Sequence, residues 1–487
     1  MNGISALFTD FYSLTMAQGY WKNGLNRYAV FEMFFRRHPF GGGFSVFAGL
    51  DTLLESLKAL RFSGDDLAYL EGIGLFDRAF LDYLKDFRFT GSLWAVDEGT
   101  VVFPQEPLVR IGGDLIQCQI VEGLILNTIN FQSLIATKTA RVWLASDKGS
   151  IMEFGLRRAQ GWDGAMSASR AAFIGGAVGT SNVLAGKDFG IPVMGTMAHS
   201  WIMAHDSEEA AFEAYADMYP DRTVFLIDTY DTLKSGLPNA MKVGKKLAAR
   251  GKNFGVRLDS GDMHYLTVQV RRILDEAGFP KATITVSNDL DETIIETLVN
   301  AKAPINSWGV GTNMVTGGNE AAFSGVYKLT ARDDGTGNMV AVMKFSDNPD
   351  KTTNPGIKQV WRIKDAQGMA VADVLGLEND SGTGETIEPG KRYVLWHPAA
   401  DYRHFYHTVE GSVERLLKLR LDRGKLLGEA LPLIQIQRTL QSGLEAFDPS
   451  YTRLLNPHIY KVSITQGLRT LKLDLIKSCL EPPGEGS

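Results

Sequence analysis

Polar and charged residues follow six short apolar runs in the middle of the chain, and their types are ones that bind ligands and take part in catalysis. An arginine side chain holds a carboxylate or a phosphate through two parallel hydrogen bonds. Carboxylates stabilise a developing cation, and an imidazole can act as a nucleophile near neutral pH. In chain order the six groups are Glu153 with Arg157 and Arg158, Thr196 with His199, Asp228 with Tyr230 and Asp231, Arg257 with Asp259 and Ser260, Ser287 with Asn288 and Asp289, and Gly309 to Thr312.

Each of these groups also has a simpler explanation. Asp, Ser and Thr are common where a loop begins a helix, because their side chains accept hydrogen bonds from the first backbone N–H groups. That explanation suffices for any one group, but not for six groups that include arginines. In parallel α/β folds the carboxyl ends of all strands open on one face, where ligands bind. The six groups together therefore favour an active site.

The last group, Gly309-Val310-Gly311-Thr312, suits a phosphate. Glycine lets backbone N–H groups approach an anion, and the threonine hydroxyl adds another donor. A tight turn is the alternative explanation for two glycines so close together. The sequence contains neither G-x-x-x-x-G-K-[ST] nor a complete G-x-G-x-x-G, so P-loop and Rossmann nucleotide sites have no support.

His199 stands out among the eight histidines because it lies just past an apolar run. His205 is six residues further on, a spacing that does not share a helical face, and no H-E-x-x-H motif occurs. A zinc pair is therefore not expected. A lone histidine is usually structural, but the position after a predicted strand favours a functional role for His199.

The elements that must position these residues are predicted from the same stretch of sequence. Four of the apolar runs begin about 25 to 31 residues apart, the length of a strand–helix unit. Such units make a parallel sheet, either open or closed into a barrel. The predicted strands are Ile151–Phe154, Val193–Gly195, Val224–Ile227, Gly255–Leu258, Thr283–Val286 and Ser307–Val310, and the predicted helices between them are Leu237–Arg250, Asp262–Glu276 and Asp291–Val299.

The two flanking regions have different patterns, and the sequence predicts three domains: 1–135, 136–330 and 331–487. The first mixes helices at Phe11–Trp21, Leu50–Leu60 and Leu67–Tyr83 with an alternating strand region at Gly91–Gly112. After about Ser324 the pattern changes to a hairpin, because Val326–Thr330 and Met339–Lys344 flank the turn residues Asp333 to Gly337. Turn-rich strands follow to about Trp396, then a helical tail whose last residues, Glu481–Ser487, are expected to fray.

Composition excludes several classes of protein. The chain has 487 residues, a net charge of −6 and no basic stripe, so a nucleic-acid partner is not expected. Two cysteines, Cys118 and Cys479, provide neither a disulfide framework nor a cysteine-rich zinc site. The N-terminus lacks the features of a signal peptide, and the long uncharged stretch Ala171–Gly186 is too short and too polar to span a membrane. A soluble, cytoplasmic protein is therefore expected. The 51 glycines indicate many tight turns and close backbone approaches.

A series of motifs lies in order along nearly the whole chain: Thr9-Asp10-Phe11-Tyr12, Phe34 to Arg37 with Pro39 to Gly42, Glu153 to Gly161, Ser181 to Gly186, Gly195-Thr196 with Ala198-His199-Ser200, Val256 to Asp262, Gly309 to Thr312, and Leu454 to His458. The series resembles nicotinate phosphoribosyltransferase. Alone, each motif has a plain alternative, such as interface packing for Tyr12 or a salt bridge to Asp259 or Asp262 for Arg257. Their order makes the resemblance specific.

The resemblance implies a fold, a reaction and partners. The fold would be the α/β type II phosphoribosyltransferase architecture: an N-terminal α+β domain packed on an irregular α/β barrel, with a C-terminal extension. The reaction would convert nicotinate and 5-phosphoribosyl 1-pyrophosphate into nicotinate mononucleotide and pyrophosphate in NAD biosynthesis. ATP would be a co-substrate and Mg²⁺ a cofactor whose ligands the sequence does not identify. The working form would be a homodimer that shares its active site between subunits.

The resemblance also implies roles for particular residues. His199 would accept a phosphoryl group from ATP, Tyr12 would stack on the pyridine ring, and Thr196 with Arg257 would hold the nicotinate carboxylate. Gly311 and Thr312 would bind the 5-phosphate. Beside this, the residue chemistry assigns Asp228 and Asp259 to the ribose hydroxyls and the cationic transition state. Arg157 and Asn288 would contact the phosphoribosyl pyrophosphate.

Other functions stay open at this point. A nicotinamide-using relative would need an acid to accept the amide N–H, and a quinolinate enzyme would need more cations for two carboxylates. A type I phosphoribosyltransferase would need paired acids directly after the run that ends at Ile227, where only Asp228 is present. A phosphate-binding barrel without catalysis would be expected to lose His199, Arg257 or the Gly309–Thr312 loop, and none of them is lost.

Overall fold

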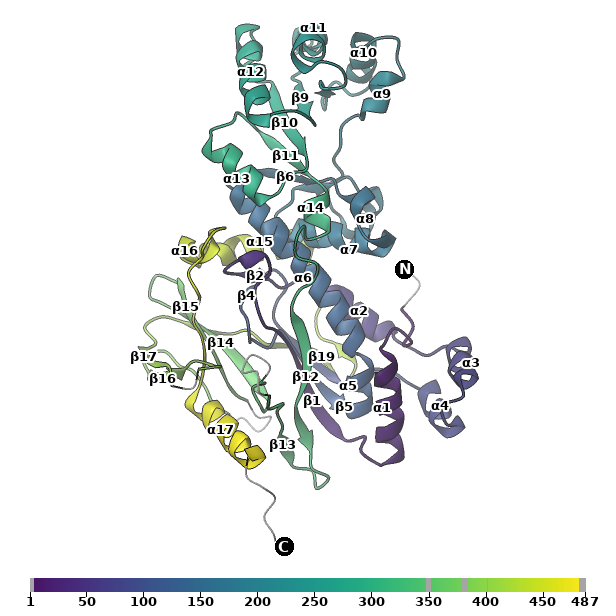
Figure 1. Cartoon of the computed structure of the whole chain (residues 1–487), viewed down its shortest axis with the longest axis vertical. Helices are drawn as coiled ribbons and strands as arrows, with labels where there is room; N and C mark the ends of the chain where they lie inside the picture. The colour runs from purple at the N-terminus through teal and green to yellow at the C-terminus, as the bar shows by residue number, and fades with distance from the viewer. Residues whose placement is uncertain (1–3, 347–351, 379–383, 401, 481–487) are drawn as a thin grey trace. The chain divides into compact units, whose positions relative to one another are not determined.

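The computed structural model describes residues 4–346, 352–378, 384–400 and 402–480, and the predicted frayed tail, Glu481–Ser487, lies outside them. The chain divides into two compact units (Figure 1). Unit 1 comprises residues 1–134 and 322–487, and unit 2 comprises residues 135–321. The division falls within the long helix α6 (Glu122–Ala145). The predicted three-domain boundaries divide the sequence differently and stay a prediction.

Within the described residues, unit 1 contains a seven-stranded sheet that combines strands from both ends of the chain. β1 runs antiparallel between β5 and β12, so the N-terminal and C-terminal stretches share one sheet. The predicted hairpin is confirmed by the antiparallel pair β12–β13. The sheet order is β13 (Met339–Ala341), β12 (Gly325–Asp333), β1 (Tyr28–Phe35), β5 (Val109–Asp114), β3 (Ser92–Ala95), β19 (Lys418–Asp422) and β20 (Lys425–Leu426).

A second, six-stranded sheet of unit 1 comes from the C-terminal stretch alone. Its order is β17 (His404–Thr408), β16 (Arg392–Trp396), β21 (Val462–Ile464), β15 (Ala370–Leu377), β14 (Lys358–Lys364) and β18 (Val413–Arg415). A short pair joins β2 (Ser45–Val46) to β4 (Val101–Val102). The helices of this unit are α1 (Phe11–Lys22), α2 (Leu50–Ala59), α3 (Gly64–Ile73), α4 (Arg78–Lys85), α5 (Leu115–Ile120), α15 (Leu433–Glu445), α16 (Pro449–Thr452) and α17 (Gln466–Leu480).

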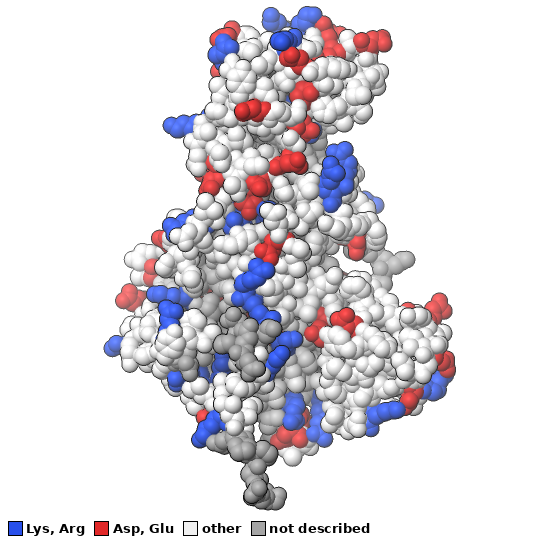
Figure 2. Space-filling view, viewed as in Figure 1, with Lys and Arg blue, Asp and Glu red and all other residues white. Residues whose placement is uncertain are grey.

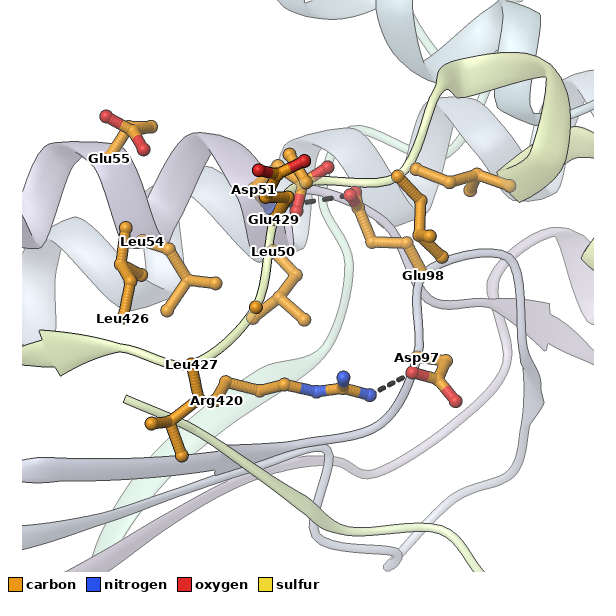
Figure 3. A pocket seen from close by; sticks show the side chains of 14 residues that line it. Leu50, Asp51, Leu54, Glu55, Asp97, Glu98, Arg420, Leu426, Leu427 and Glu429 are labelled. Carbon is orange, nitrogen blue, oxygen red and sulfur yellow. Dashed lines mark hydrogen bonds and ion pairs between the residues drawn. The ribbon is translucent and has the colours of Figure 1, made fainter. Parts of the chain in front are cut away.

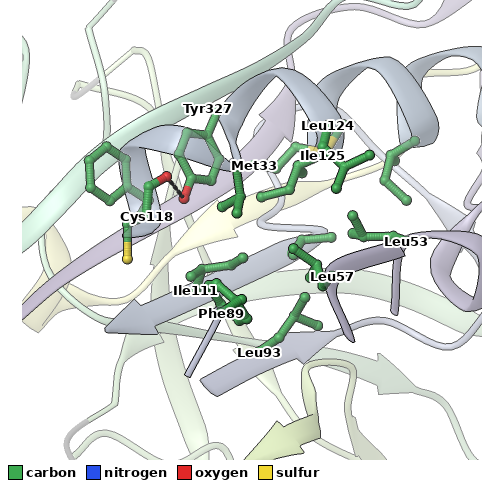
Figure 4. Packing of buried hydrophobic residues seen from close by; sticks show 14 of the residues in the cluster. Met33, Leu53, Leu57, Phe89, Leu93, Ile111, Cys118, Leu124, Ile125 and Tyr327 are labelled. Carbon is green, nitrogen blue, oxygen red and sulfur yellow. Dashed lines mark hydrogen bonds between the residues drawn. The ribbon is translucent and has the colours of Figure 1, made fainter. Parts of the chain in front are cut away.

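The main core of unit 1 lies between the seven-stranded sheet and its helices (Figure 4). Leu53 and Leu57 of α2 pack with Leu93 and Ile111 of the sheet, as the amphipathic pattern of Leu50–Leu60 requires. Tyr327 of β12 is buried in the same cluster, and its hydroxyl donates a 3.0 Å hydrogen bond to the backbone carbonyl of Cys118. The core therefore joins the two segments of the chain that make up unit 1.

Unit 2 is built on a six-stranded sheet in which every neighbouring pair is parallel. Its order is β7 (Gly179–Thr180), β6 (Ser150–Glu153), β11 (Ser307–Val310), β10 (Thr283–Asn288), β9 (Gly255–Leu258) and β8 (Val224–Leu226). Val193 extends the β7 edge by one parallel bridge to Thr180. No ladder joins that segment to β8 among the described residues, so the barrel is incomplete.

The helices of unit 2 follow the strands in the expected alternation. They are α7 (Gly161–Ile174), α8 (Val183–Phe189), α9 (His199–Met203), α10 (Glu208–Met218), α11 (Leu237–Ala249), α12 (Met263–Glu276), α13 (Glu292–Asn300) and α14 (Thr312–Val315). Asp262 and Asp291 cap α12 and α13 by accepting a backbone N–H from Tyr265 and Ile294. The predicted strand and helix positions in this region are confirmed, except that Val193–Gly195 forms the single bridge rather than a strand.

Three predictions in unit 1 are corrected by the structure. The strands do not end at about Trp396, because β17 to β20 follow it and the next helix, α15, begins at Leu433. Leu67–Tyr83 is not one helix: α3 ends at Ile73, the next residue, Gly74, has a left-handed φ of 74°, and α4 begins after Asp77. Gly91–Gly112 is divided among β3, β4 and β5 rather than forming one alternating region. In these last two places glycine or turn residues interrupt the pattern that suggested a longer element.

Acidic and basic side chains are interspersed on the face drawn in Figure 2. In the part of the chain that the structure describes, no helix is both long and apolar enough to cross a membrane. Cys118 is buried and Cys479 is exposed, and neither forms a disulfide.

Candidate functional site

The predicted site residues of unit 2 gather where strands β8, β9, β10 and β11 end. The parallel ladders place Arg257 beside Leu226 and Thr285, and Asn288 beside Val310. Because all these strands run in the same direction, their carboxyl ends meet at one edge of the sheet. The structure therefore brings together side chains that are far apart in sequence.

Arg257 is the hub of this edge. Its Nε donates to Ser287 Oγ at 2.7 Å, its NH1 to Thr196 Oγ1 at 2.9 Å, and its NH2 to Asp259 Oδ1 at 2.8 Å. The guanidinium carbon also lies 5.5 Å from the ring centre of Phe154. The side chain is 16 % exposed, so its charge faces a site that is largely shielded from water. Three directed hydrogen bonds fix the plane of the guanidinium.

The two aspartates of the edge are linked through the backbone. Asp228 Oδ2 accepts hydrogen bonds from Asp259 N at 2.8 Å and Ser260 Oγ at 2.6 Å. Asp228 Oδ1 is buried and accepts no hydrogen bond among the described residues. An orphaned carboxylate oxygen in a polar edge fits a hydroxyl donor or a hydrated cation.

Asp259 is held in its ionised form. Burial by itself would raise its pKa, but a hydrogen bond from Ser287 and the charge of Arg257 outweigh burial, so the pKa of Asp259 lies below its usual value. His199 adds a smaller effect in the same direction. A carboxylate that stays charged suits the stabilisation of a developing cation.

His199 begins α9 and faces the same edge. Its Nδ1 is hydrogen-bonded to Thr229 Oγ1 at 3.0 Å, and its Nε2 lies 3.8 Å from Asp259 Oδ2. Since one ring nitrogen is engaged by Thr229, the imidazole has a defined orientation. The other nitrogen faces the carboxylate.

The Gly309–Thr312 loop leads directly into α14. The first backbone N–H groups of a helix have no partner within the helix and can face an anion. Space under the loop is tight: a Cβ on Gly155 would overlap the side chain of Val315, and one on Gly309 would stand 2.6 Å from the Phe154 ring. Glycine is required at both places.

Buried Glu153 supports the neighbouring edge. Its carboxylate accepts hydrogen bonds from Ser169 Oγ at 2.9 Å, from Thr180 Oγ1 at 2.5 Å and from the backbone N–H of Gly155. Glu153 is 1 % exposed, so it is a structural anchor rather than a group that meets solvent. Its hydrogen bonds hold the start of the Gly155–Arg158 segment.

Three further predicted residues lie outside this hydrogen-bonded cluster. Asn288 is exposed at the end of β10 and has a φ of 113°, an unusual backbone conformation for a residue with a side chain. Arg157 is exposed in the turn after β6. Tyr12 belongs to α1 of unit 1, where its hydroxyl donates to Glu122 at 3.2 Å. Burial and the Glu122 charge raise the pKa of Tyr12 to about 12.

Two site residues were not assigned a role from the sequence: Ser287 was named only as one of the polar residues at a strand end, and Thr229 was not named among them. Ser287 accepts from Arg257 and donates to Asp259, and Thr229 orients His199. Ser287 is the next-to-last residue of β10 and Thr229 lies three residues after β8, and this nearness to strand ends was the available signal. Their types are too common at strand ends for that signal to identify a role.

A different cavity, of about 90 Å³, lies in unit 1 (Figure 3). Its lining combines leucines with the carboxylates of Asp51, Glu55, Asp97, Glu98 and Glu429. Arg420, its cation, is paired with Asp97. This lining is unsuited to anionic ligands, and it contains none of the predicted site residues.

No group of three or more His, Cys, Asp or Glu side chains that could hold a metal ion occurs among the described residues. At the strand edge, Asp228 Oδ1 is the buried oxygen that a cation brought in by a substrate could approach.

Family models match the chain in three successive stretches. Residues 7–130 match the nicotinate phosphoribosyltransferase N-terminal domain, residues 150–368 the nicotinate phosphoribosyltransferase family, and residues 357–472 the nicotinate phosphoribosyltransferase C-terminal domain. Together they cover most of the sequence, including the strand edge described above.

Relatives and solved structures agree with the family models. The chain is 40 % identical to a nicotinate phosphoribosyltransferase of Bacillus subtilis, over 97 % of this chain and 95 % of the relative. It is 33 % identical to the human protein of that name, over 96 % of this chain and 95 % of the relative. A crystal structure of human nicotinic acid phosphoribosyltransferase matches with a TM-score of 0.83 and 30 % identity, covering 96 % of this chain and 99 % of that one. The predicted fold class is confirmed by this match.

Proposed function

The chain belongs to the nicotinate phosphoribosyltransferase family, and from this premise we propose that it transfers the phosphoribosyl group to nicotinate in NAD biosynthesis. The pyridine nitrogen would form a bond to C1′ of 5-phosphoribosyl 1-pyrophosphate. The bond from C1′ to the pyrophosphate oxygen would break, and pyrophosphate would leave with the bonding pair. The products would be nicotinate mononucleotide and pyrophosphate.

The observation that carries this proposal is the arrangement around Arg257. Its guanidinium is fixed by Ser287, Thr196 and Asp259, yet it keeps N–H groups that these bonds do not use. A fixed, shielded guanidinium is the natural partner of a carboxylate. We assign the nicotinate carboxylate to Arg257 and Thr196.

The aspartates would act on the ribose. As C1′ loses pyrophosphate, positive charge develops on the ribosyl ring, and ionised Asp259 would stabilise it. Asp228 Oδ1 would accept a ribose hydroxyl, which supplies the hydrogen bond that this buried oxygen lacks. Phosphoribosyl pyrophosphate would arrive as its Mg²⁺ complex, and the same carboxylate edge would tolerate that cation.

The phosphates would lie along the loops after β10 and β11. Gly311 and Thr312 would contact the 5-phosphate through backbone N–H groups and the threonine hydroxyl. Asn288 and Arg157, both exposed, would contact the remaining phosphate oxygens. The arginine charge would offset part of the substrate's negative charge.

ATP hydrolysis would be coupled to this reaction through His199. A ring nitrogen of His199 would attack the terminal phosphorus of ATP, the bond to the ADP oxygen would break, and the phosphorylated imidazole would later be hydrolysed to phosphate. The orientation that Thr229 gives the ring supports this role. The added phosphoryl group would strengthen binding of the Mg²⁺–phosphoribosyl pyrophosphate complex.

Tyr12 would complete the site from a second copy of the chain. Its ring is 47 % exposed, so it has a free surface on which a pyridine ring could stack. A cytoplasmic homodimer with a shared active site is the form that we propose.

The direct test is a substrate panel of nicotinate, nicotinamide and quinolinate, each with phosphoribosyl pyrophosphate, with and without ATP and Mg²⁺. Of the three pyridines, only nicotinate is expected to give pyrophosphate release, and ATP is expected to stimulate that release. Turnover of nicotinamide in place of nicotinate would contradict the proposed substrate.

The phosphohistidine is tested separately with His199→Ala. This variant is expected to lose stimulation by ATP while it keeps some ATP-independent pyrophosphate release. His205→Ala is the matched control, because His205 is bonded to the backbone of Trp201. ATP hydrolysis that stays coupled to turnover in His199→Ala would contradict the role of His199.

A further inference from the structure

Three charged side chains are buried together in unit 2, outside the cluster around Arg257. Glu292 is the first residue of α13, and its Oε2 lies 2.5 Å from Lys138 Nζ while its Oε1 lies 3.0 Å from Arg141 Nε. Lys138 and Arg141 belong to α6, and all three side chains are at most 7 % exposed. Burial would raise the pKa of Glu292, but the two cations lower it, so the carboxylate is charged.

Stability alone does not explain such a group. Buried ion pairs recover little more than the cost of removing their charges from water, and well-packed apolar side chains often serve the fold equally well. Ion pairs do fix geometry, because each partner must stay in one orientation. The surroundings of Glu292 indicate which geometry is fixed.

The first connection leads to the turn between β10 and α13. Glu292 lies two residues after Leu290, whose N–H donates to the carbonyl of Asn288 at 2.6 Å. Asn288 has the strained φ of 113°. The carbonyl of Leu290 accepts a 3.1 Å hydrogen bond from Asn313 Nδ2 of α14. The ion pairs of Glu292 thus fix the turn between β10 and α13. This turn holds α14 through the hydrogen bond from Asn313 to Leu290.

The second connection leads to the segment that follows α14. Gly318 lies against Lys138: a Cβ on Gly318 would stand 3.5 Å from Lys138 Nζ and 3.6 Å from Asn313 Oδ1. The Gly318 N–H donates to Thr316 Oγ1 at 3.3 Å, and Thr316 Oγ1 donates to the Thr312 carbonyl at 2.6 Å. Lys138 therefore lies next to the segment that directly follows α14.

We propose that Glu292, together with Lys138, is a positioning residue for phosphoribosyl pyrophosphate. It fixes Asn288 relative to Thr312, so that the loops after β10 and β11 have the spacing that the phosphates of one substrate molecule require. This inference rests on the proposed function, which assigns both residues to that substrate. Glu292 itself touches no substrate.

The proposal makes a distinction between the two substrates. Arg257 and Thr196 are held by hydrogen bonds that involve neither α13 nor α14. Loosening the Glu292 ion pairs should therefore weaken the phosphate side of the site and leave the nicotinate side intact. A merely structural role would instead lower activity toward both substrates or change only the melting temperature.

The test is Glu292→Gln, which keeps the size of the side chain and removes its charge. The KM for phosphoribosyl pyrophosphate is expected to rise at least about tenfold, because small misplacements of binding groups have effects of this size. The KM for nicotinate is expected to stay within about twofold. The matched control is Glu296→Gln, one turn further along α13 and only half-buried, which should leave both values unchanged.

Asn313→Ala provides a second variant in case Glu292→Gln does not fold, because it removes the bond to Leu290 without leaving a buried charge unpaired. It should raise the KM for phosphoribosyl pyrophosphate in the same selective manner. Unchanged KM for this substrate in a folded variant, or equal losses for both substrates, would overturn the proposal.

Calorimetric binding of phosphoribosyl pyrophosphate separates this inference from the proposed function. If the unaltered protein binds that substrate but does not turn over nicotinate, the proposed reaction fails and the binding comparison still tests Glu292. If the unaltered protein and Glu292→Gln bind phosphoribosyl pyrophosphate equally tightly, the positioning role of Glu292 fails. If the unaltered protein does not bind it, the proposed function and this inference both fail, whereas loss of binding in Glu292→Gln alone supports the inference.

Discussion

Arg257 combines two tasks that another cation could not perform together. It carries the charge for a carboxylate, and its three hydrogen bonds to Ser287, Thr196 and Asp259 hold neighbouring groups in place. A lysine ammonium has the same charge but is compact and lacks the planar fork of donors. Charge and geometry can therefore be separated by one substitution.

Arg257→Lys is expected to raise the KM for nicotinate roughly 10- to 100-fold, the value of one or two charged hydrogen bonds. The KM for phosphoribosyl pyrophosphate should change by less than about threefold. Steady-state kinetics with each substrate varied in turn measures both values. Equal increases would place Arg257 elsewhere in the site.

Asp259 leads to a prediction about pH. Its pKa lies below the ordinary 3.8 because the Ser287 hydrogen bond and the Arg257 charge outweigh burial. Its ionised form therefore stabilises the folded state above that pH, and the contribution is lost as the pH falls through the lower folded-state pKa. Ser287→Ala should raise this pKa and shift acid-induced loss of stability to higher pH.

Melting temperatures of Ser287→Ala and of the unaltered protein between about pH 3 and pH 6 measure that shift. Ser307→Ala is the control, since the Ser307 hydroxyl pairs with Thr285 and with no acid. A uniform change in melting temperature at all pH values would mean that Ser287 affects packing and not the charge of Asp259.

At the scale of elements, the α14 helix fits against the turn after β6 with no spare volume. Gly155 has an ordinary φ of −93°, so its lack of a side chain is required by space and not by backbone conformation. The Cβ of Val315 would lie 2.9 Å from a Cβ on Gly155. The position of the phosphate loop thus depends on one missing methyl group.

Gly155→Ala should cost about 1–3 kcal/mol of stability through overpacking. It should also raise the KM for phosphoribosyl pyrophosphate, because α14 must move. Gly164→Ala is the matched control: it lies in α7 with no neighbour within 4 Å and should be neutral or up to about 1 kcal/mol stabilising. Adding Val315→Ala to Gly155→Ala should restore part of the loss, and no restoration would contradict the steric explanation.

Short apolar runs and capped amphipathic helices were predictable from sequence, and elements without those signals were not. β9 and β11 have the bounds that their apolar runs predicted, and α12 and α13 begin next to the aspartates that cap them. The 24-residue helix α6 was missed because much of its circumference is buried, which leaves no continuous polar stripe. β7 has only two residues and no pattern to detect.

The residues of the candidate site were likewise predictable only in part. Strand ends and motif resemblance identified Arg257, Asp259 and His199, because several such groups and motifs occur together in order along the chain. The roles of Ser287, which the sequence named only within a strand-end group, and of Thr229 became clear only through their contacts in space. Buried Glu292 was indistinguishable from any acid in the first turn of a helix, since its partners on α6 are about 150 residues earlier in the chain.

At the scale of the whole molecule, buried polar contacts join the N-terminal and C-terminal segments of unit 1. Arg362 of β14 donates to Asp373 of β15 at 2.6 Å and to the backbone carbonyl of Val101 at 2.8 Å. Asp373 also accepts a hydrogen bond from Tyr460 at 3.0 Å. Arg362 and Asp373 are 5 % and 0 % exposed, so this ion pair is deep within the unit.

Arg362→Met should destabilise unit 1 by about 3–5 kcal/mol, because it leaves the Asp373 carboxylate buried without its partner. Lys364→Met, two residues along the same strand, is the control. Its ion pair with Glu414 is partly exposed and should be worth at most about 1 kcal/mol. Thermal unfolding of the two variants measures the difference, and similar melting temperatures would refute the assigned importance of the buried pair.

The strand order of unit 1 also has a consequence for the protein during its synthesis. β1 emerges from the ribosome early, but its neighbour β12 is made only after all of unit 2. At ~5–20 residues per second, the interval is roughly 15 to 60 seconds. Throughout that time one edge of an almost wholly apolar strand is open to other nascent chains. Expression at a lower growth temperature, or with added chaperones, should therefore raise the yield of folded protein more than any change to the active site.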